Sequence, residues 1–201
     1  TAEDTIKMLA DGVAGSMNDL KRQRSHILGI SMGGMIAQEF ALNYPKMVEK
    51  LVLLSTTCGG PKSVSPPPQL MDLLTKPRTG MTAEERAKMA IPIIFAGDYI
   101  KTNPENIKQF TQRILKAPIA EDAYMRQIEA IKKHDTYDRL PNIKAPTLVM
   151  AGKKDILVMP QNAKILAERI PGAKLIYLEK SAHFLSEEVD KLVNTLVEFL
   201  A

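Results

Sequence analysis

The feature that most constrains the fold of this chain is a serine set between glycines, where one hydrophobic pattern gives way to another. The stretch from His26 to Phe40 reads HILGISMGGMIAQEF, an apolar run followed by glycines around Ser31 and then by a helical pattern. Glycines leave no side chains to clash in a sharp turn from strand to helix. We expect such a turn to lift the Ser31 hydroxyl clear of the backbone, beside the Met32 amide at the start of the helix. A negatively charged oxygen would be stabilised there.

Strands and helices alternate over the two ends of the chain. Apolar runs predict strands buried on both faces at residues 50–55, 147–151 and 174–178, and a shorter apolar run at 27–30 predicts the strand before Ser31. Apolar residues at three- and four-residue intervals predict helices over 1–21, after Ser31 as far as Pro45, over 160–170 and from Ser186 to the end. Thr1 is the expected cap of the first helix. This alternation indicates an α/β fold with a mainly parallel sheet and flanking helices.

The middle of the chain interrupts the alternation. It begins with a proline-rich loop and continues with helical segments, one opened by a capping box of Thr82 with Glu85 and one by Asn103-Pro104. We therefore expect two units. The core comprises residues 1–60 and 142–201, and residues 61–141 form a helical cap inserted between two strands of the sheet.

Two further polar residues follow predicted strands. Asp155 comes just after the strand at 147–151, and His183 follows the strand at 174–178. The carboxyl ends of parallel strands meet at one edge of the sheet, where open α/β sheets place their ligands. A serine needs a base to take its proton and a carboxylate to orient that base. Ser31, Asp155 and His183 also follow the chain order that a hydrolase of this architecture requires.

Each of these residues has a simpler interpretation when taken alone. A glycine-rich turn between strand and helix can cradle a phosphate, Asp155 can serve as a turn or capping residue, and His183 can be an ordinary loop histidine. The phosphate-binding interpretation leaves Asp155 and His183 without a role. The three residues together favour a catalytic triad.

These motifs make the chain resemble the α/β-hydrolase fold family. The GISMGG, AGKKD and SAHF turns and the helical insertion are similar to the branch of serine esterases and 3-oxoadipate enol-lactonases. The resemblance implies Ser31 as nucleophile, His183 as general base and then acid, Asp155 as orienting carboxylate, and Met32 as one oxyanion-hole amide. It also implies that the cap roofs the substrate pocket and that no cofactor or metal takes part.

The resemblance further implies that a complete family member has four strands before the first helix found here, so that this is a partial α/β-hydrolase fold. One of the missing loops would supply the second oxyanion amide. We expect the strand before Ser31 to have an open edge, which favours a homo-oligomer or pairing with a complementing N-terminal segment. Loss of one oxyanion donor lowers kcat by roughly 10²- to 10³-fold, so the activity is expected to be impaired.

Composition narrows the possible partners. The 27 basic and 23 acidic residues give a net charge of +4 without a basic block or stripe, which argues against nucleic acid. No apolar run is long enough to span a membrane, and the N-terminus has no signal-peptide pattern. Cys58 is the single cysteine, which suits the cytoplasm, and the three histidines form no metal-binding motif.

The sequence therefore predicts a serine hydrolase that cleaves small carboxylic esters through an acyl-enzyme. The alternative within this class is a lactone or enol-lactone hydrolase. The alternative from another class is an inactive or weakly active hydrolase that self-associates. His26, His134 and Cys58 are expected to be structural or to face solvent.

Overall fold

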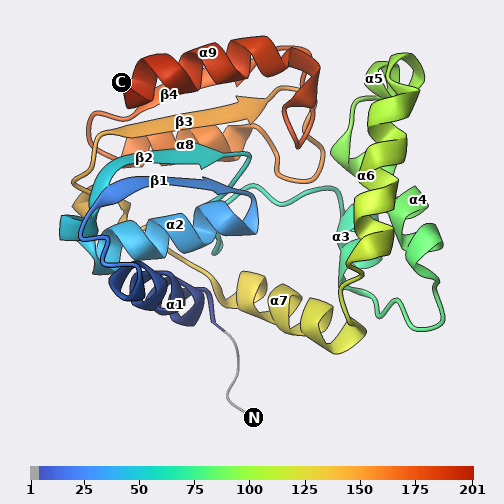
Figure 1. Ribbon diagram of the computed structural model, residues 1–201, viewed down its shortest axis with the longest axis horizontal. Coiled ribbons are helices and arrows are strands. Elements are labelled where there is room, and N and C mark those ends of the chain that lie inside the picture. The colour runs from blue at the N-terminus through green and yellow to red at the C-terminus, as the bar shows by residue number, and fades with distance from the viewer. Residues whose placement is uncertain (1–4) are drawn as a thin grey trace.

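The computed structural model describes residues 5–201 and contains a four-stranded parallel sheet in the order β1-β2-β3-β4 (Figure 1). The α-helices and strands follow the alternation that the sequence predicts, with the helical insertion between β2 and β3. In chain order they are α1 (Ile6–Asp19), β1 (Ser25–Ile30), α2 (Met32–Asn43), β2 (Val48–Leu54), α3 (Pro68–Thr75), α4 (Ala83–Ile94), α5 (Gly97–Thr102), α6 (Pro104–Lys116), α7 (Glu121–Lys133), β3 (Thr147–Gly152), α8 (Gln161–Arg169), β4 (Lys174–Leu178) and α9 (Val189–Leu200). Three short 3-10 helices complete the list, η1 (Pro45–Met47), η2 (Leu140–Asn142) and η3 (Ser186–Glu188).

The two faces of the sheet are covered unequally. Helices α2 and α8 pack on one face, where Phe40, Leu53 and Leu166 are fully buried, and α1 packs against α2. Helix α9 lies over the other face, where Val52 and Met150 are fully buried (Figure 1). Strand β3 is buried along its whole length, as its continuous apolar sequence predicts.

Two helix ends differ from the sequence prediction. The expected cap at Thr1 lies outside the described residues, and within them the first helix begins at Ile6, with the Thr5 side chain accepting a hydrogen bond from the Met8 amide. The last α-helix begins at Val189 rather than at Ser186. The three residues before it form the 3-10 helix η3, whose two glutamates hold the preceding loop instead of continuing an α-helix.

Strand β1 is an edge strand, because among the described residues it pairs with β2 alone. Leu28 on this strand is 49% exposed, although it is a large apolar residue in the middle of a strand. The open edge expected from the sequence is therefore present in the described part of the chain.

The helical insertion lies beyond the carboxyl ends of the strands, where helices α3 to α6 stand apart from the sheet (Figure 1). The capping box of Thr82 and Glu85 forms as predicted at the start of α4. The two connections of the insertion are paired at its base, where Gly59 and Asp135 form an antiparallel bridge and Thr136 N donates to Cys58 O at 2.9 Å.

His134 is buried beside this bridge, and its side chain has an exposed fraction of zero. Neither ring nitrogen has a hydrogen-bond partner among the described residues, and Nδ1 lies 3.9 Å from Glu39 Oε1. Burial lowers the pKa of His134 to about 4, although the Glu39 carboxylate opposes this shift. Arg139 pairs with Glu39 and supports the neutral form of His134.

The close contact between β1 and α2 should make the fold intolerant of a side chain at Gly29. A Cβ at this position would lie 2.2 Å from the carbonyl oxygen of Gly33, a backbone atom that cannot rotate away. We expect Gly29→Ala to lower the free energy of unfolding by roughly 1 to 3 kcal/mol. Gly12→Ala on α1 is the matched control, because a Cβ at Gly12 would have open space around it. This substitution should raise the free energy of unfolding by up to about 1 kcal/mol. Urea unfolding measures the free energy of unfolding of both variants. Equal values for Gly29→Ala and Gly12→Ala would contradict the close contact.

The buried His134 should also make stability depend on pH. An unfolded histidine binds its proton near pH 6.5, whereas the folded chain binds it only near pH 4. Between these values the unfolded state holds more protons, so the free energy of unfolding should fall by about 2 to 3 kcal/mol as pH drops from 6.5 to 4. In His134→Leu this contribution should disappear. Denaturant unfolding across this range tests it, and identical pH slopes for the two proteins would refute it.

Candidate active site

Ser31 occupies a strained turn at the junction of β1 and α2. Its backbone has φ 55° and ψ −123°, a conformation that non-glycine residues rarely adopt. Ser31 N donates to Leu54 O on the neighbouring strand at 3.0 Å, and Gly34 N donates to Ser31 O at 2.9 Å. These bonds hold the turn from both sides, so that the serine lies at the carboxyl end of β1.

Two glycines allow this turn to pack closely. At Gly29 a side chain would collide with the Gly33 carbonyl, and at Gly34 it would collide with Thr56, whose Cβ would be 2.5 Å away. Thr56 Oγ1 in turn donates to Ser31 O at 2.7 Å. The glycines of the sequence motif therefore allow β1, α2 and the loop after β2 to pack closely against one another.

Met32 is the first residue of α2. The first N–H groups of a helix have no acceptor within the helix, and the helix dipole places partial positive charge there. The Met32 amide is thus among the N–H groups at the start of α2, directly after Ser31.

Asp155 and His183 are joined directly. His183 Nδ1 lies 2.8 Å from Asp155 Oδ2, and both side chains are almost fully buried. The other carboxylate oxygen, Oδ1, accepts hydrogen bonds from Leu157 N and Val158 N, both at 2.9 Å. A carboxylate with this set of donors places the proton of the imidazole on Nδ1 and leaves Nε2 as an acceptor.

A second close backbone approach brings these two residues together. A Cβ at Gly152, the last residue of β3, would lie 2.2 Å from Ser181 O. Lys154 N donates to that same Ser181 oxygen at 2.9 Å, and Lys153 N donates to Leu178 O at 2.9 Å. The turn with Asp155 and the loop with His183 are thus hydrogen-bonded through their backbones, as Gly152 permits.

The structure brings Asp155 and His183 into contact and places Ser31 at the carboxyl end of β1, at the same edge of the sheet. Among the described residues, no hydrogen bond joins the Ser31 hydroxyl to the imidazole of His183. Such bonds are often long in enzymes without substrate and tighten when it binds.

Contacts around His183 include residues that the sequence analysis did not single out. His183 N donates to Ile94 O of the insertion at 3.1 Å, and the Phe184 ring packs edge to face on Phe95 and Phe110. Glu187 accepts hydrogen bonds from Ala96 N and Ala182 N. The partners are up to 91 residues apart in the chain, so local sequence patterns carry no signal for them.

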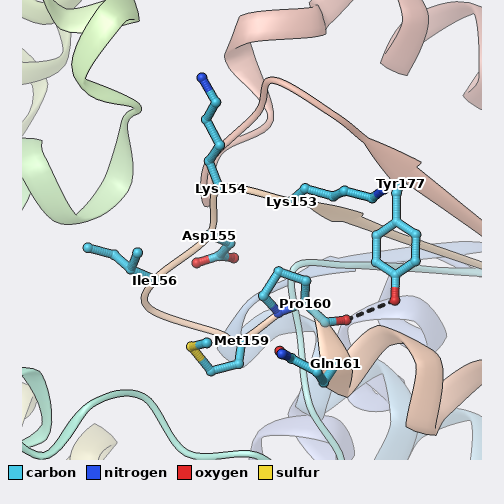
Figure 2. A pocket seen from close by; sticks show the side chains of 8 residues that line it. All are labelled: Lys153, Lys154, Asp155, Ile156, Met159, Pro160, Gln161 and Tyr177. Carbon is cyan, nitrogen blue, oxygen red and sulfur yellow. Dashed lines mark hydrogen bonds between the residues drawn. The ribbon is translucent and has the colours of Figure 1, made fainter.

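Two hollows flank this region. Figure 2 shows one of about 460 Å³ beside Asp155, where the Tyr177 hydroxyl donates to Pro160 O at 3.1 Å and Lys153 extends toward the tyrosine ring. The other, of about 440 Å³, lies between α5 and the loop that leads into α9, and Lys154, Lys180 and Glu187 are among its lining residues. Neither hollow is lined by Ser31 or His183.

Residues 5–201 contain neither a cluster of metal-binding side chains nor a helix that could span a membrane. In this range, no three or more histidine, cysteine, aspartate and glutamate side chains gather in a group able to hold a metal ion. No helix in the same range has the length and apolarity to cross a membrane.

Comparison with known proteins shows which family the chain resembles in sequence. The chain is 29% identical to a poly(3-hydroxyalkanoate) depolymerase of Ectopseudomonas oleovorans, over 96% of its own length. It is 31% identical to a 2-hydroxy-6-oxononadienedioate/2-hydroxy-6-oxononatrienedioate hydrolase of Burkholderia vietnamiensis, over 94% of its length. It spans 66% of the length of each of these relatives.

Solved structures agree on the fold. The enol-lactonase of Burkholderia xenovorans superposes with a TM-score of 0.86 at 28% identity, covering 100% of this chain and 74% of the enzyme. An esterase of Exiguobacterium antarcticum superposes with a TM-score of 0.85 at 25% identity, covering 99% of this chain and 75% of the esterase. Residues 3–190 match the family described as serine aminopeptidase, S33. The chain therefore belongs to the S33 serine aminopeptidase family and has the α/β-hydrolase fold.

Proposed function

We propose that this chain is a serine hydrolase that cleaves small carboxylic esters with a triad of Ser31, His183 and Asp155. The observation that carries the proposal is the buried hydrogen bond between His183 and Asp155, at the edge of the sheet where the strained turn presents Ser31. A histidine oriented by a carboxylate, at the same edge of the sheet as a serine, is the arrangement that activates a serine hydroxyl.

In the proposed reaction, the Ser31 oxygen attacks the ester carbonyl carbon while His183 Nε2 takes the hydroxyl proton. Asp155 remains ionised and holds the imidazolium through Nδ1. The Met32 amide donates to the oxyanion that forms. When the intermediate collapses, the bond to the leaving alcohol breaks and His183 returns the proton to that alcohol. Water then attacks the acyl-enzyme by the same steps, releasing the acid and restoring Ser31.

Helices α3 to α7 are proposed to act as the cap over the substrate, in line with the expected units 1–60 with 142–201 and 61–141. The place of α3 to α6 beyond the carboxyl ends of the strands supports this role (Figure 1). The contact between His183 N and Ile94 O also brings the insertion to the proposed catalytic histidine.

A lactone hydrolase is the second candidate, and the similarity to an enol-lactonase favours it. The same residues would open the ring, with the leaving alcohol remaining attached to the acyl group. Comparing kcat/KM for p-nitrophenyl butyrate and for a simple lactone separates the two candidates.

Replacing the proposed nucleophile gives the most direct activity test. Ser31→Ala should lower hydrolysis of p-nitrophenyl acetate and butyrate by at least about 10³-fold, because it removes the oxygen that forms the proposed acyl-enzyme. Ser16→Ala on the outer side of α1 is the matched control and should hydrolyse both esters at the unaltered rate. Full activity in Ser31→Ala would overturn the proposal.

We also propose that the open edge of β1 pairs with another strand, from a second copy of this chain or from an added N-terminal segment. The exposure of Leu28 on an unpaired edge supports this association. Light scattering should give the mass of a dimer or larger species for the purified chain, and a monomer at every concentration would rule out the homo-oligomer. A weakly active, self-associating protein with a single oxyanion donor is the remaining alternative.

The proposed location is the cytoplasm. The single cysteine, Cys58, is buried, and burial raises its pKa to about 11, so that it is an unreactive thiol suited to a reducing compartment.

A further inference from the structure

Glu187 joins the loop with His183 to the helical insertion. It lies in η3, just after this loop, and its carboxylate is hydrogen-bonded to two backbone amides that belong to different parts of the fold. Oε1 accepts from Ala96 N, between α4 and α5, at 2.8 Å, and Oε2 accepts from Ala182 N, the residue before His183, at 3.2 Å. One side chain thus holds the insertion and the proposed catalytic loop at a fixed separation.

Two other contacts connect the same segments. His183 N donates to Ile94 O at 3.1 Å. The rings of Phe95 and Phe184 pack edge to face with their centres 5.8 Å apart, and Phe110 of α6 packs against both rings. Each of residues 94–96 therefore contacts the segment around His183.

The charge of Glu187 is directed to these amides rather than to a cation. Lys154 and Lys180 line the same hollow as Glu187, and Lys154 pairs with Asp98 at 3.7 Å. Among the described residues, no basic side chain forms an ion pair with Glu187. Its carboxylate therefore has the two amides as its partners, and each oxygen serves one of them.

The neighbouring Glu188 offers a comparison within the chain. Its Oε2 accepts from Lys180 N at 2.7 Å and from Ser181 Oγ at 3.1 Å. These partners lie in the loop itself, and Glu188 makes no contact with residues 94–96 through its carboxylate. The link to the insertion is thus particular to Glu187.

We propose that Glu187 is a positioning residue that fixes His183 by coupling its loop to residues 94–96 of the insertion. The proposal rests on the role of His183 given above. A carboxylate can accept from both amides, whereas the amide of a glutamine has one acceptor oxygen and turns its NH₂ group toward the other donor. Glu187→Gln therefore keeps the size of the side chain and breaks the link.

The test compares Glu187→Gln with Glu198→Gln, an identical charge change at an exposed position of α9. Hydrolysis of p-nitrophenyl butyrate should show kcat lowered by roughly 10-fold or more in Glu187→Gln with KM within about 3-fold. Glu198→Gln should match the unaltered chain in both constants. Glu187→Asp, which is one methylene too short to reach both amides, should also lower kcat.

Nuclear magnetic resonance gives readouts that do not need activity. In Glu187→Gln, the amide that loses its acceptor, Ala96 N or Ala182 N, should exchange its hydrogen at least about 10-fold faster. The His183 Nδ1 proton signal, which reports the bond to Asp155, should broaden or disappear. Glu188→Gln should leave the exchange of Ala96 unchanged.

The outcomes separate this proposal from the proposed function. If activity depends on Ser31 but Glu187→Gln keeps both kcat and the His183 proton signal, then Glu187 only stabilises the loop and the positioning role is refuted. If the unaltered chain hydrolyses no ester, the exchange rates and the His183 signal decide the positioning role on their own. In that case, an unchanged His183 proton signal in Glu187→Gln would also refute the positioning role.

Discussion

The structure depends on the close approach of α2 to β1, where the backbone of Gly33 occupies the space of a missing side chain at Gly29. This contact makes the chain turn sharply after β1 and holds Ser31 at positive φ. The strain is balanced by hydrogen bonds from Ser31 N to Leu54 O and from Thr56 to Ser31 O. The serine is therefore fixed by the packing of the sheet and not by a flexible loop.

A second close approach, at Gly152, has the same effect at the other end of the site. It lets the backbone of the Asp155 turn bond to the loop with His183. Both approaches lie at the carboxyl ends of parallel strands, so the sheet sets the distance between the serine and the histidine. The helical insertion adds a third constraint through residues 94–96, which makes the position of His183 sensitive to elements far away in the sequence.

Much of this arrangement could be predicted from local sequence patterns. The four strands follow from continuous apolar runs, and the turn at Ser31 follows from its glycines, because both depend on neighbouring residues. The start of the last helix could not be predicted, since Glu187 and Glu188 are used by the preceding loop. The link between Glu187 and Ala96 spans 91 residues, so it depends on tertiary packing that no local pattern encodes.

The central claim is that Ser31 is an activated nucleophile, and covalent labelling with a fluorophosphonate tests it most directly. Mass spectrometry of the digested chain should find one adduct, on the peptide that contains Ser31. In Asp155→Asn the labelling rate should fall by roughly 10³- to 10⁴-fold, because the imidazole loses the carboxylate that orients it. An unlabelled Ser31 in the folded chain, or an adduct on a different serine, would contradict the account.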